Sequence, residues 1–436
     1  MNSRGIGGAL VLAFLLAIVL IVICAPGTDT AGTAPQDATS ISGEPVAGDA
    51  SLTRPDTPDG AGNVTAGNNR FAFDLYRRLA TDPAHAGGNL FFSPYSTSSA
   101  LAITYEGARG TTADEIGAVL HLPANDTLRR EGFAALNAAL NRGSGNYTLR
   151  TANALWAEET YSFLPDYIDV AARWYGANAT SLDFINDPEG SRETINRWVE
   201  EQTEDRIRDL LPPNSIDPLT RLVITNAIYF KGTWVEQFDA NETTEEEFRV
   251  APNETVLVPM MHGDAVYPYA ETETLRVLEM PYAHGNETEL AMLVLLPKKD
   301  NLTAAEEVLD AERLAGLRGS LVSQNVRVFF PKFTLETGYP LPGVLAAMGM
   351  PTAFANDAAD LSGMDGTRDL FITGVFHKAF IDVNEEGTEA AAATGVIAGG
   401  GVTPVFRADH PFVFLIVEKD SGAILFMGRV VNPESP

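Results

Sequence analysis

The sequence of 436 residues contains a single cysteine, Cys24, so the chain cannot form an internal disulfide. Histidine is also scarce, with six residues, and no G-x-S-x-G, H-E-x-x-H, Walker or Cys/His metal-binding pattern occurs. These absences argue against the common hydrolase, metalloprotease and nucleotide-binding classes. The sequence therefore predicts no enzyme, no catalytic residue, no metal ligand and no cofactor.

Basic residues are also few relative to acidic ones. Only six lysines stand against 24 arginines, and 58 acidic residues bring the formal net charge to −28. An acidic surface repels nucleic acid and anionic lipid, and no basic stripe that would suit heparin or nucleic acid is present. A protein partner is the remaining expectation, and we expect a monomer.

The one long uncharged run lies at the N-terminus, from Ile6 to Ile23, and Arg4 precedes it. Residues 1–24 are therefore interpreted as an export signal or an N-terminal membrane anchor. Cys24 stands where a lipidated cysteine would follow such a run, but Ile23 is larger than the residue usual at that position. Both readings place the protein outside the cell, secreted or tethered to the outer face of the membrane.

Residues 25–67 contain almost no large apolar side chains and are rich in Gly, Ala, Thr, Asp and Pro, which predicts a flexible linker. As a coil this linker would span roughly 35 Å. Residues 68–436 have the composition of one folded domain. Eight N-x-Thr sequons agree with an exported, glycosylated surface; they begin at Asn63, Asn125, Asn146, Asn178, Asn241, Asn253, Asn286 and Asn301.

The stretch NEEGTEAAAATGVIA, residues 384–398, is unusual in its alternation. In an extended conformation one face would carry only small or medium uncharged side chains, namely Thr388, Ala390, Ala392, Thr394, Val396 and Ala398. Four alanines and nearby glycines are poor for a permanent strand. Composition alone leaves an Ala-rich helix followed by a Gly-rich loop as an equal alternative.

The flanking sequences favour the strand. Together with VFHKAFIDV before it and HPFVFLIVEKDSGAILFMGRVVNP after it, the segment closely resembles the reactive loop of the serpins, a family of protease inhibitors. NLFFSPYSTSSALAITYEGARGTTADEI and RLVITNAIYFKGTWVEQFD resemble further serpin blocks, and the similarity extends over about residues 69–433. The resemblance, to inhibitory serpins of prokaryotic or archaeal type, implies an α+β fold. It implies three β-sheets, the largest central, with about eight to nine surrounding helices and an exposed reactive loop.

The resemblance also implies roles for particular residues. The hinge, where the loop leaves the central sheet, comprises Glu385, Glu386, Gly387, Thr388, Glu389, Ala390, Ala391, Ala392 and Ala393. A polar cluster under the sheet, the shutter, comprises Ser93, Ser96, Asn226 and His377. The top of the sheet, the breach, comprises Trp234, Lys332 and Glu385, with Lys332 paired to Glu385. The reactive bond is expected at Gly400–Gly401 or Gly401–Val402.

The function implied is that of a suicide substrate for a serine protease, which is trapped as an acyl-enzyme when the cleaved loop inserts into the central sheet. Small residues around the reactive bond suit elastase-like or subtilisin-like targets. The alternative is a non-inhibitory serpin that acts as a carrier, chaperone or surface glycoprotein. Gly387, Thr388 and the alanines that follow favour inhibition, since non-inhibitory relatives commonly carry bulky, charged or proline residues in the hinge.

Overall fold

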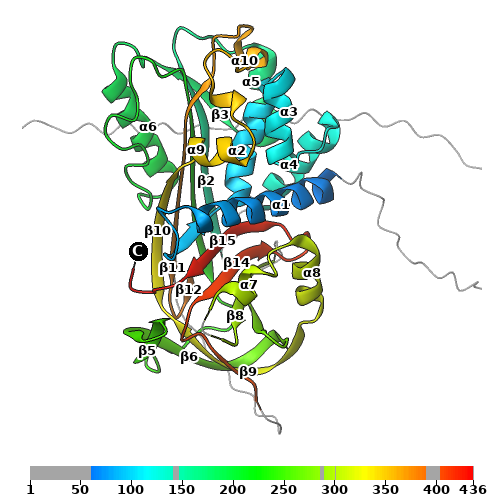
Figure 1. The fold of residues 1–436 in the computed structure, drawn as a ribbon, viewed down its shortest axis with the longest axis vertical. Coiled ribbons are helices and arrows are strands. Elements are labelled where there is room, and N and C mark those ends of the chain that lie inside the picture. Colours follow the sequence, from blue (N-terminus) through cyan, green and yellow to red (C-terminus); the bar gives the residue numbers. More distant parts are fainter. Residues whose placement is uncertain (1–59, 141–146, 285–288, 300, 389–402, 436) are drawn as a thin grey trace, which may run out of the picture. The chain divides into compact units, whose positions relative to one another are not determined.

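A computed structural model describes residues 60–140, 147–284, 289–299, 301–388 and 403–435. These residues all belong to one compact unit (Figure 1). The predicted signal or anchor and most of the predicted linker lie outside the described residues. Within the described ranges, no helix is long and apolar enough to span a bilayer.

The described chain contains ten α-helices and one 3₁₀ helix. They are α1 (Gly60–Thr81), α2 (Pro94–Gly107), α3 (Gly110–Val119), α4 (Asp126–Leu140), α5 (Pro165–Tyr175), α6 (Pro188–Gln202), α7 (Thr303–Glu306), α8 (Ala311–Gly319), α9 (Pro342–Met348), η1 (Thr352–Phe354) and α10 (Ser362–Asp365). Two of the α-helices, α7 and α10, are four residues long. The resemblance implied about eight to nine helices, and the described residues contain ten α-helices when these single turns are counted.

Fifteen strands form two hydrogen-bonded sheets. They are β1 (Leu90–Phe92), β2 (Tyr147–Glu158), β3 (Asn178–Leu182), β4 (Leu222–Thr233), β5 (Thr244–Ala251), β6 (Glu254–Glu271), β7 (Leu275–Pro281), β8 (Leu290–Pro297), β9 (Val322–Pro331), β10 (Phe333–Pro340), β11 (Ile372–Val383), β12 (Gly387–Thr388), β13 (Val405–Arg407), β14 (Phe412–Glu418) and β15 (Ile424–Val430). The six-stranded sheet has the order β10-β11-β4-β2-β3, with β12 paired to β4. The nine-stranded sheet has the order β1-β15-β14-β8-β7-β6-β9-β13, with β5 paired to β6.

The α+β architecture agrees with the prediction, but the number of sheets differs in the described residues. Three sheets were expected and two are found, because β6 is 18 residues long and pairs in turn with β5, β9 and β7. This one strand joins β5, β9 and β13 to β7, β8 and β14. Two of the three expected sheets are therefore joined into one continuous hydrogen-bonded sheet.

The boundary predicted for the linker is also corrected. Helix α1 begins at Gly60, so the last part of the predicted linker, residues 60–67, is helical. A Cβ on Gly132 of α4 would lie 2.4 Å from the carbonyl oxygen of Gly60, so the two helices meet backbone to backbone. Val64 is buried beside this contact. Small residues that indicate flexibility by composition here permit close helix packing instead.

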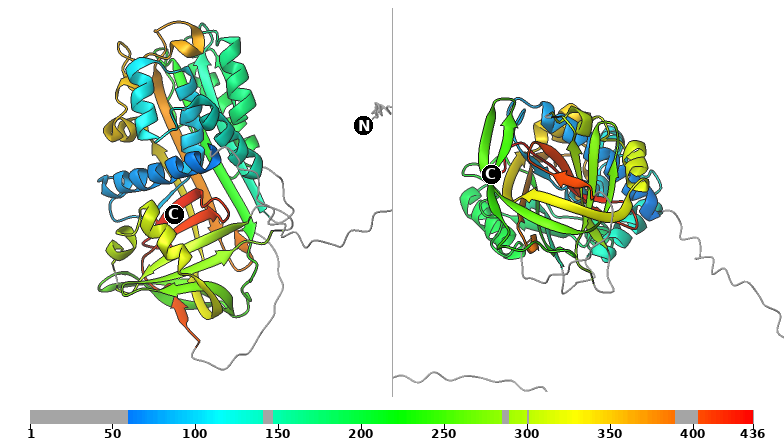
Figure 2. Two further views of the ribbon diagram at one scale, coloured as in Figure 1. Left: turned by 90° about the vertical axis from the view of Figure 1, so that its right-hand side faces the viewer. Right: turned by 90° about the horizontal axis from the view of Figure 1, so that it is seen from below.

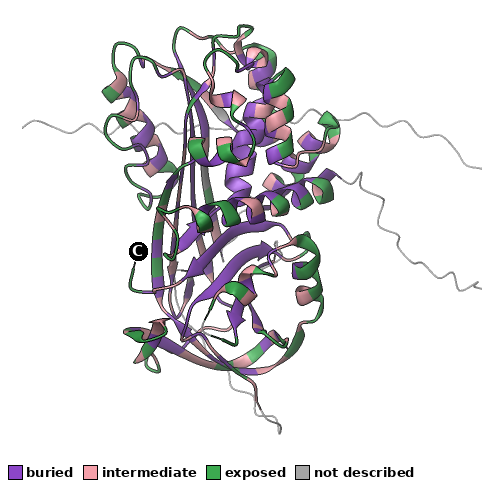
Figure 3. Cartoon of the chain, viewed as in Figure 1, coloured by how far each residue is buried: buried purple, intermediate pink, exposed green. Residues whose placement is uncertain are grey.

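The six-stranded sheet runs along the length of the unit, and helices cover both of its faces (Figures 1 and 2). On one face α6 packs Ile195 and Val199 against Val223 and Ala227 of β4. On the other face, Ile224 and Ile228 of β4 belong to the main core. Every residue of β8, β14 and β15 is buried, and most of them belong to that core (Figure 3). Even-numbered residues of β4 therefore face the core, and odd-numbered ones face α6.

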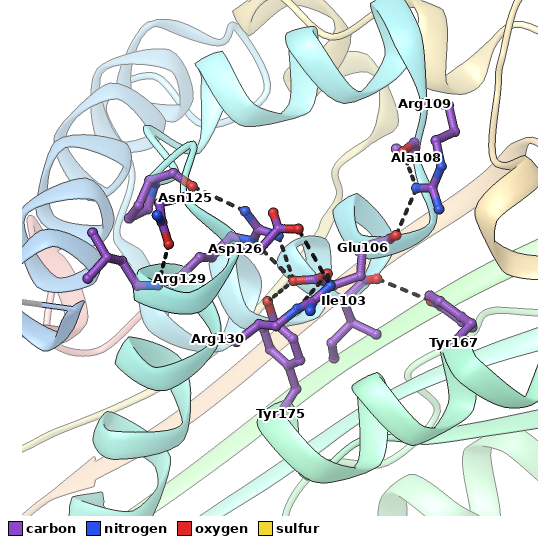
Figure 4. Close-up of polar contacts among 12 residues, drawn as sticks. Ile103, Glu106, Ala108, Arg109, Asn125, Asp126, Arg129, Arg130, Tyr167 and Tyr175 are labelled. Carbon is purple, nitrogen blue, oxygen red and sulfur yellow. Dashed lines mark hydrogen bonds and ion pairs between the residues drawn. The ribbon is translucent and has the colours of Figure 1, made fainter.

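A buried ionic cluster joins helices α2, α4 and α5 (Figure 4). One carboxylate oxygen of Glu106 accepts from Arg129 Nε at 3.0 Å and from Tyr175 Oη at 2.7 Å, and the other accepts from Arg130 Nη2 at 2.7 Å. The side chains of Glu106 and Arg129 are 2% and 1% exposed. The carboxylate has acceptor capacity for several donors, and the arginines balance its charge, which allows burial of both partners.

Candidate functional site

Strands β4 and β11 lie side by side in parallel at the centre of the six-stranded sheet. The register pairs Val375 with Ile224, His377 with Asn226 and Phe380 with Tyr229. The chain that leaves β11 turns back, and β12 then pairs antiparallel with β4, Gly387 opposite Thr233 and Thr388 opposite Gly232. The hinge therefore begins at the end of the seam between β4 and β11.

Gly387 forms the turn that brings the chain back to β4. Asn384 and Gly387 form an isolated antiparallel bridge, and the φ angle of Gly387 is +145°, which L side chains rarely adopt. A Cβ at this position would lie 2.1 Å from the carbonyl oxygen of Gly232. Backbone crowding and backbone conformation thus both require glycine here.

The two charged residues predicted for the breach, Lys332 and Glu385, meet in the structure. Lys332 Nζ lies 2.8 Å from Glu385 Oε2, and Thr243 Oγ1 donates to Glu385 Oε1 at 2.7 Å. Burial alone would raise the pKa of Glu385, but the hydrogen bonds from Lys332 and Thr243 hold it below its usual range. The hinge is therefore held to the neighbouring strands by an ionised carboxylate.

Trp234 holds the backbone of the same turn. Its indole Nε1 donates to the carbonyl of Asn384 at 3.1 Å, and its backbone N–H donates to the carbonyl of Glu386 at 3.0 Å. The ring stacks on Tyr282 with centroids 4.4 Å apart. Phe238 N–H donates to the carbonyl of Glu385 at 2.9 Å, so two consecutive hinge carbonyls are satisfied by the segment after β4.

The four residues predicted for the shutter also come together, beneath the seam. His377 Nδ1 donates to Asn226 Oδ1, and the backbone N–H of Ser93 donates to His377 Nε2 at 3.0 Å. Asn226 Nδ2 donates to Ser96 Oγ at 2.5 Å. Ser93 caps helix α2, because its Oγ accepts from Ser96 N–H at 3.1 Å. Both seam strands are thus hydrogen-bonded to each other and to α2.

Complete burial lowers the pKa of His377 to about 3. The imidazole is therefore neutral at physiological pH, with its proton on Nδ1 because Nε2 accepts a hydrogen bond. A neutral ring can bridge Asn226 and Ser93 without an uncompensated buried charge.

Sequence reasoning missed two members of this cluster. Asn153 of β2 accepts from Asn226 Nδ2 at 2.6 Å and from Ser96 Oγ at 2.9 Å. Thr97 Oγ1 lies 3.4 Å from Asn226 Oδ1. Thr243, which binds Glu385, was missed in the same way. Single polar residues within apolar segments were the available signal, but the sequence does not say which of them meet.

The rest of the predicted loop lies outside the described residues. This applies to the hinge residues Glu389, Ala390, Ala391, Ala392 and Ala393 and to the reactive-bond residues Gly400, Gly401 and Val402. After them, β13 pairs in parallel with β9 through Val405, Phe406 and Arg407. In the described part of the chain, no three His, Cys, Asp or Glu side chains gather as a metal site would require.

Comparison with known proteins agrees with this geometry. Residues 66–433 match the sequence profile of the serpin (serine protease inhibitor) family. Leukocyte elastase inhibitor of Bos taurus is 44% identical over 383 residues, which cover 85% of this chain and 99% of that protein. An uncharacterised serpin-like protein of Thermococcus kodakarensis is 43% identical over 373 residues, covering 84% and 85% of the two chains.

Solved structures show the same fold. Uncleaved ovalbumin superimposes with a TM-score of 0.76 at 32% identity, covering 85% of this chain and all of that one. Human thyroxine-binding globulin with bound thyroxine gives a TM-score of 0.77 at 31% identity, covering 86% and 99% of the two chains. The extent of the sequence match and the shared fold lead to one conclusion: this chain belongs to the serpin family, a family of serine protease inhibitors and not of enzymes.

Proposed function

We propose that this serpin is a suicide substrate for a serine endopeptidase. The protease serine Oγ attacks the carbonyl carbon of the reactive bond, that peptide bond breaks, and the new amino terminus leaves with the C-terminal fragment. The loop remains joined to the serine as an ester. Insertion of the freed loop between β4 and β11 then moves the protease and distorts its active site before water hydrolyses the ester.

The register of the hinge is the observation that carries this proposal. Continuing the pairs Gly387–Thr233 and Thr388–Gly232 along β4 would bring Thr394 opposite Asn226. Continuing the Asn384–Gly387 bridge along β11 would bring Thr394 opposite His377. Asn226 and His377 already face each other across the seam. One strand can therefore pair with both neighbours in a single register and replace their contact.

The same register decides which loop side chains enter the core. Loop residues opposite even-numbered β4 residues share their core-facing side. These are the small or medium uncharged residues Thr388, Ala390, Ala392, Thr394, Val396 and Ala398. Insertion would add on the order of ten backbone hydrogen bonds at roughly 0.5–1.5 kcal/mol each. The uninserted state is accordingly metastable.

The target class follows from the residues near the reactive bond. No lysine or arginine stands between Lys378 and Arg407, so a trypsin-like specificity pocket would lack its charged anchor. Small residues around Gly400 and Gly401 suit elastase-like or subtilisin-like enzymes, and the likeness to leukocyte elastase inhibitor supports this assignment. Mass spectrometry of the released peptide should show a new amino terminus at Gly401 or Val402. Cleavage after Arg407 would overturn the assignment.

The test of inhibition is direct. The purified chain is incubated with pancreatic elastase or subtilisin, and a complex that survives boiling in SDS is sought by electrophoresis. Protease with its serine blocked beforehand should give no such complex. Cleaved serpin should also melt at a higher temperature than intact serpin. Cleavage without complex and without thermal gain would instead support the non-inhibitory carrier, chaperone or surface glycoprotein.

We further infer export and glycosylation, which would place the inhibitor with extracellular proteases. The support lies in the apolar N-terminal run and in five described sequon asparagines that are all exposed: Asn63, Asn125, Asn241, Asn253 and Asn301. Protein from the native host should carry glycan masses on these peptides and should be accessible to protease added outside intact cells. Unmodified peptides from an intracellular pool would contradict this inference.

A further inference from the structure

A surface pocket of about 540 Å³ lies where the end of α1 meets the ends of α3 and α9. Its rim carries Arg77, Arg78, Asp74 and His121, and Val119 and Met348 lie among its apolar residues. The helices that form it stand in the upper half of Figure 1, away from β12 and the hinge. The proposed mechanism of loop insertion does not involve this pocket.

The polar rim has an excess of positive charge. One Asp74 oxygen lies 3.0 Å from Arg77 Nη1, and the other lies 2.8 Å from His121 Nε2. The single carboxylate of the rim is therefore already shared between two partners. Arg78 is exposed, and its side chain has no hydrogen-bond or ion-pair partner among the described residues. The Arg78 guanidinium is therefore available to a ligand beside the apolar residues of the pocket.

The backbone at His121 gives a second, independent indication. Helix α3 ends in a turn where Leu122 N–H donates to Gly117 O at 2.9 Å and His121 N–H approaches Ala118 O at 3.3 Å. The position of His121 in this Schellman motif usually belongs to glycine, because its φ is positive, here +51°. Histidine is less favourable there, yet its ring is what reaches Asp74 and the pocket. Such a residue is a reason to look for a function at the site.

We propose that this pocket binds a small carboxylate with an apolar body. The apolar residues would cover the body of the ligand, and Arg78 would pair with its carboxylate, a geometry that guanidinium groups favour. Arg77 already donates to Asp74 and, through Nη2, to the carbonyl of Leu309 at 2.6 Å. The volume falls within the range of small-molecule sites in proteins. A simple inorganic anion would leave the apolar surface uncovered, and a neutral apolar ligand would leave Arg78 unpaired.

The test is titration calorimetry of the full chain with 4-phenylbutyrate at 0.15 M salt, where distant charges are largely screened. We expect saturable binding of one molecule per chain. The neutral isostere 4-phenylbutanamide, which lacks the charge, and acetate, which lacks the apolar body, should each bind at least tenfold more weakly. Equal binding of the acid and the amide, or no saturable binding of the acid, would overturn the proposal.

Matched variants locate the site. Arg78→Gln should weaken 4-phenylbutyrate binding about tenfold, the effect of losing one charge-assisted hydrogen bond. Arg70→Gln removes the same charge from an exposed position of the same helix outside the pocket and should leave binding unchanged. Ala118→Phe, at an exposed lining position, should fill the pocket and abolish binding. Melting curves of the ligand-free variants check folding; equal loss in Arg70→Gln and Arg78→Gln would refute the assignment.

Discussion

Lys332 and Glu385 are joined by an ion pair of 2.8 Å that ties the start of the reactive loop to the strand connection beside it. The Glu385 side chain is 11% exposed and that of Lys332 is 37% exposed, so solvent screens the pair only in part. Thr243 holds the second carboxylate oxygen. The pair therefore stabilises the described turn of the hinge, in a structure where β4 and β11 pair directly with each other.

Reversal of one charge in this pair should favour premature insertion. Lys332→Glu would replace attraction with repulsion, and we expect polymerisation on mild heating to become several-fold faster, measured by native electrophoresis or size-exclusion chromatography. Lys298→Glu, which breaks an exposed 2.7 Å pair with Glu271 away from the hinge, is the control and should polymerise at the parent rate. Equal rates for all three proteins would remove the pair from the mechanism.

In the proposed mechanism, insertion proceeds from Thr388, which lies opposite Gly232 of β4. Thr388→Arg would bring an unpaired charge to the core side of the entering strand, at a cost of several kcal/mol. Hydrolysis of the acyl-enzyme should then be faster than loop insertion. The variant should be cleaved at the same bond but should give no SDS-resistant complex and no gain in melting temperature. Glu389→Arg changes the opposite face, which already carries a charge, and should still inhibit. Full inhibition by Thr388→Arg would show that loop insertion is not the mechanism.

The buried histidine makes stability depend on pH. In the unfolded chain the His377 imidazole becomes protonated below about pH 6.5. In the folded chain it stays neutral until the pH falls to about 3. The free energy of unfolding should therefore fall as pH falls between these values, by roughly 2–3 kcal/mol at pH 4.5. His377→Gln should lose this part of the pH dependence. A His377 imidazole that titrates near pH 6.5 in NMR spectra would contradict the prediction.

The cluster around Glu106 should support the helices rather than the loop. Glu106→Gln would leave Arg129, buried at 1% exposure, without its main counter-charge, and we expect a loss of about 3–5 kcal/mol in the free energy of unfolding. Glu204→Gln, which breaks an exposed 3.4 Å contact with Arg150, should have little effect in the same denaturant titration. The two variants should inhibit with the same stoichiometry while folded. A small loss for Glu106→Gln would mean that water reaches this cluster.

The local pattern of the sequence allowed a strand at the hinge but did not decide for it. Uncharged side chains at every second position from Thr388 to Ala398 suit a strand that enters a core, yet the same alanines suit a helix, and the resemblance of the flanking blocks settled the choice. The need of Asn226 for buried partners likewise followed from its place in an apolar run. The resemblance of the flanking blocks then identified the partners of Asn226 and the pairing of Lys332 with Glu385, which the structure brings together.

The tertiary structure decided what depends on contacts between distant segments. Whether Asn153 and Thr97 meet Asn226 depends on strand register and on the placement of α2, neither of which a local pattern specifies. Residues 60–67 were predicted as part of a flexible linker, whereas the structure places Gly60 of α1 in backbone contact with Gly132 of α4. Strand β6 joined two expected sheets because its pairing partners change along its length. Side-chain alternation is a property of one strand. Which strand lies next to it, and in which register, is a property of the whole packed core.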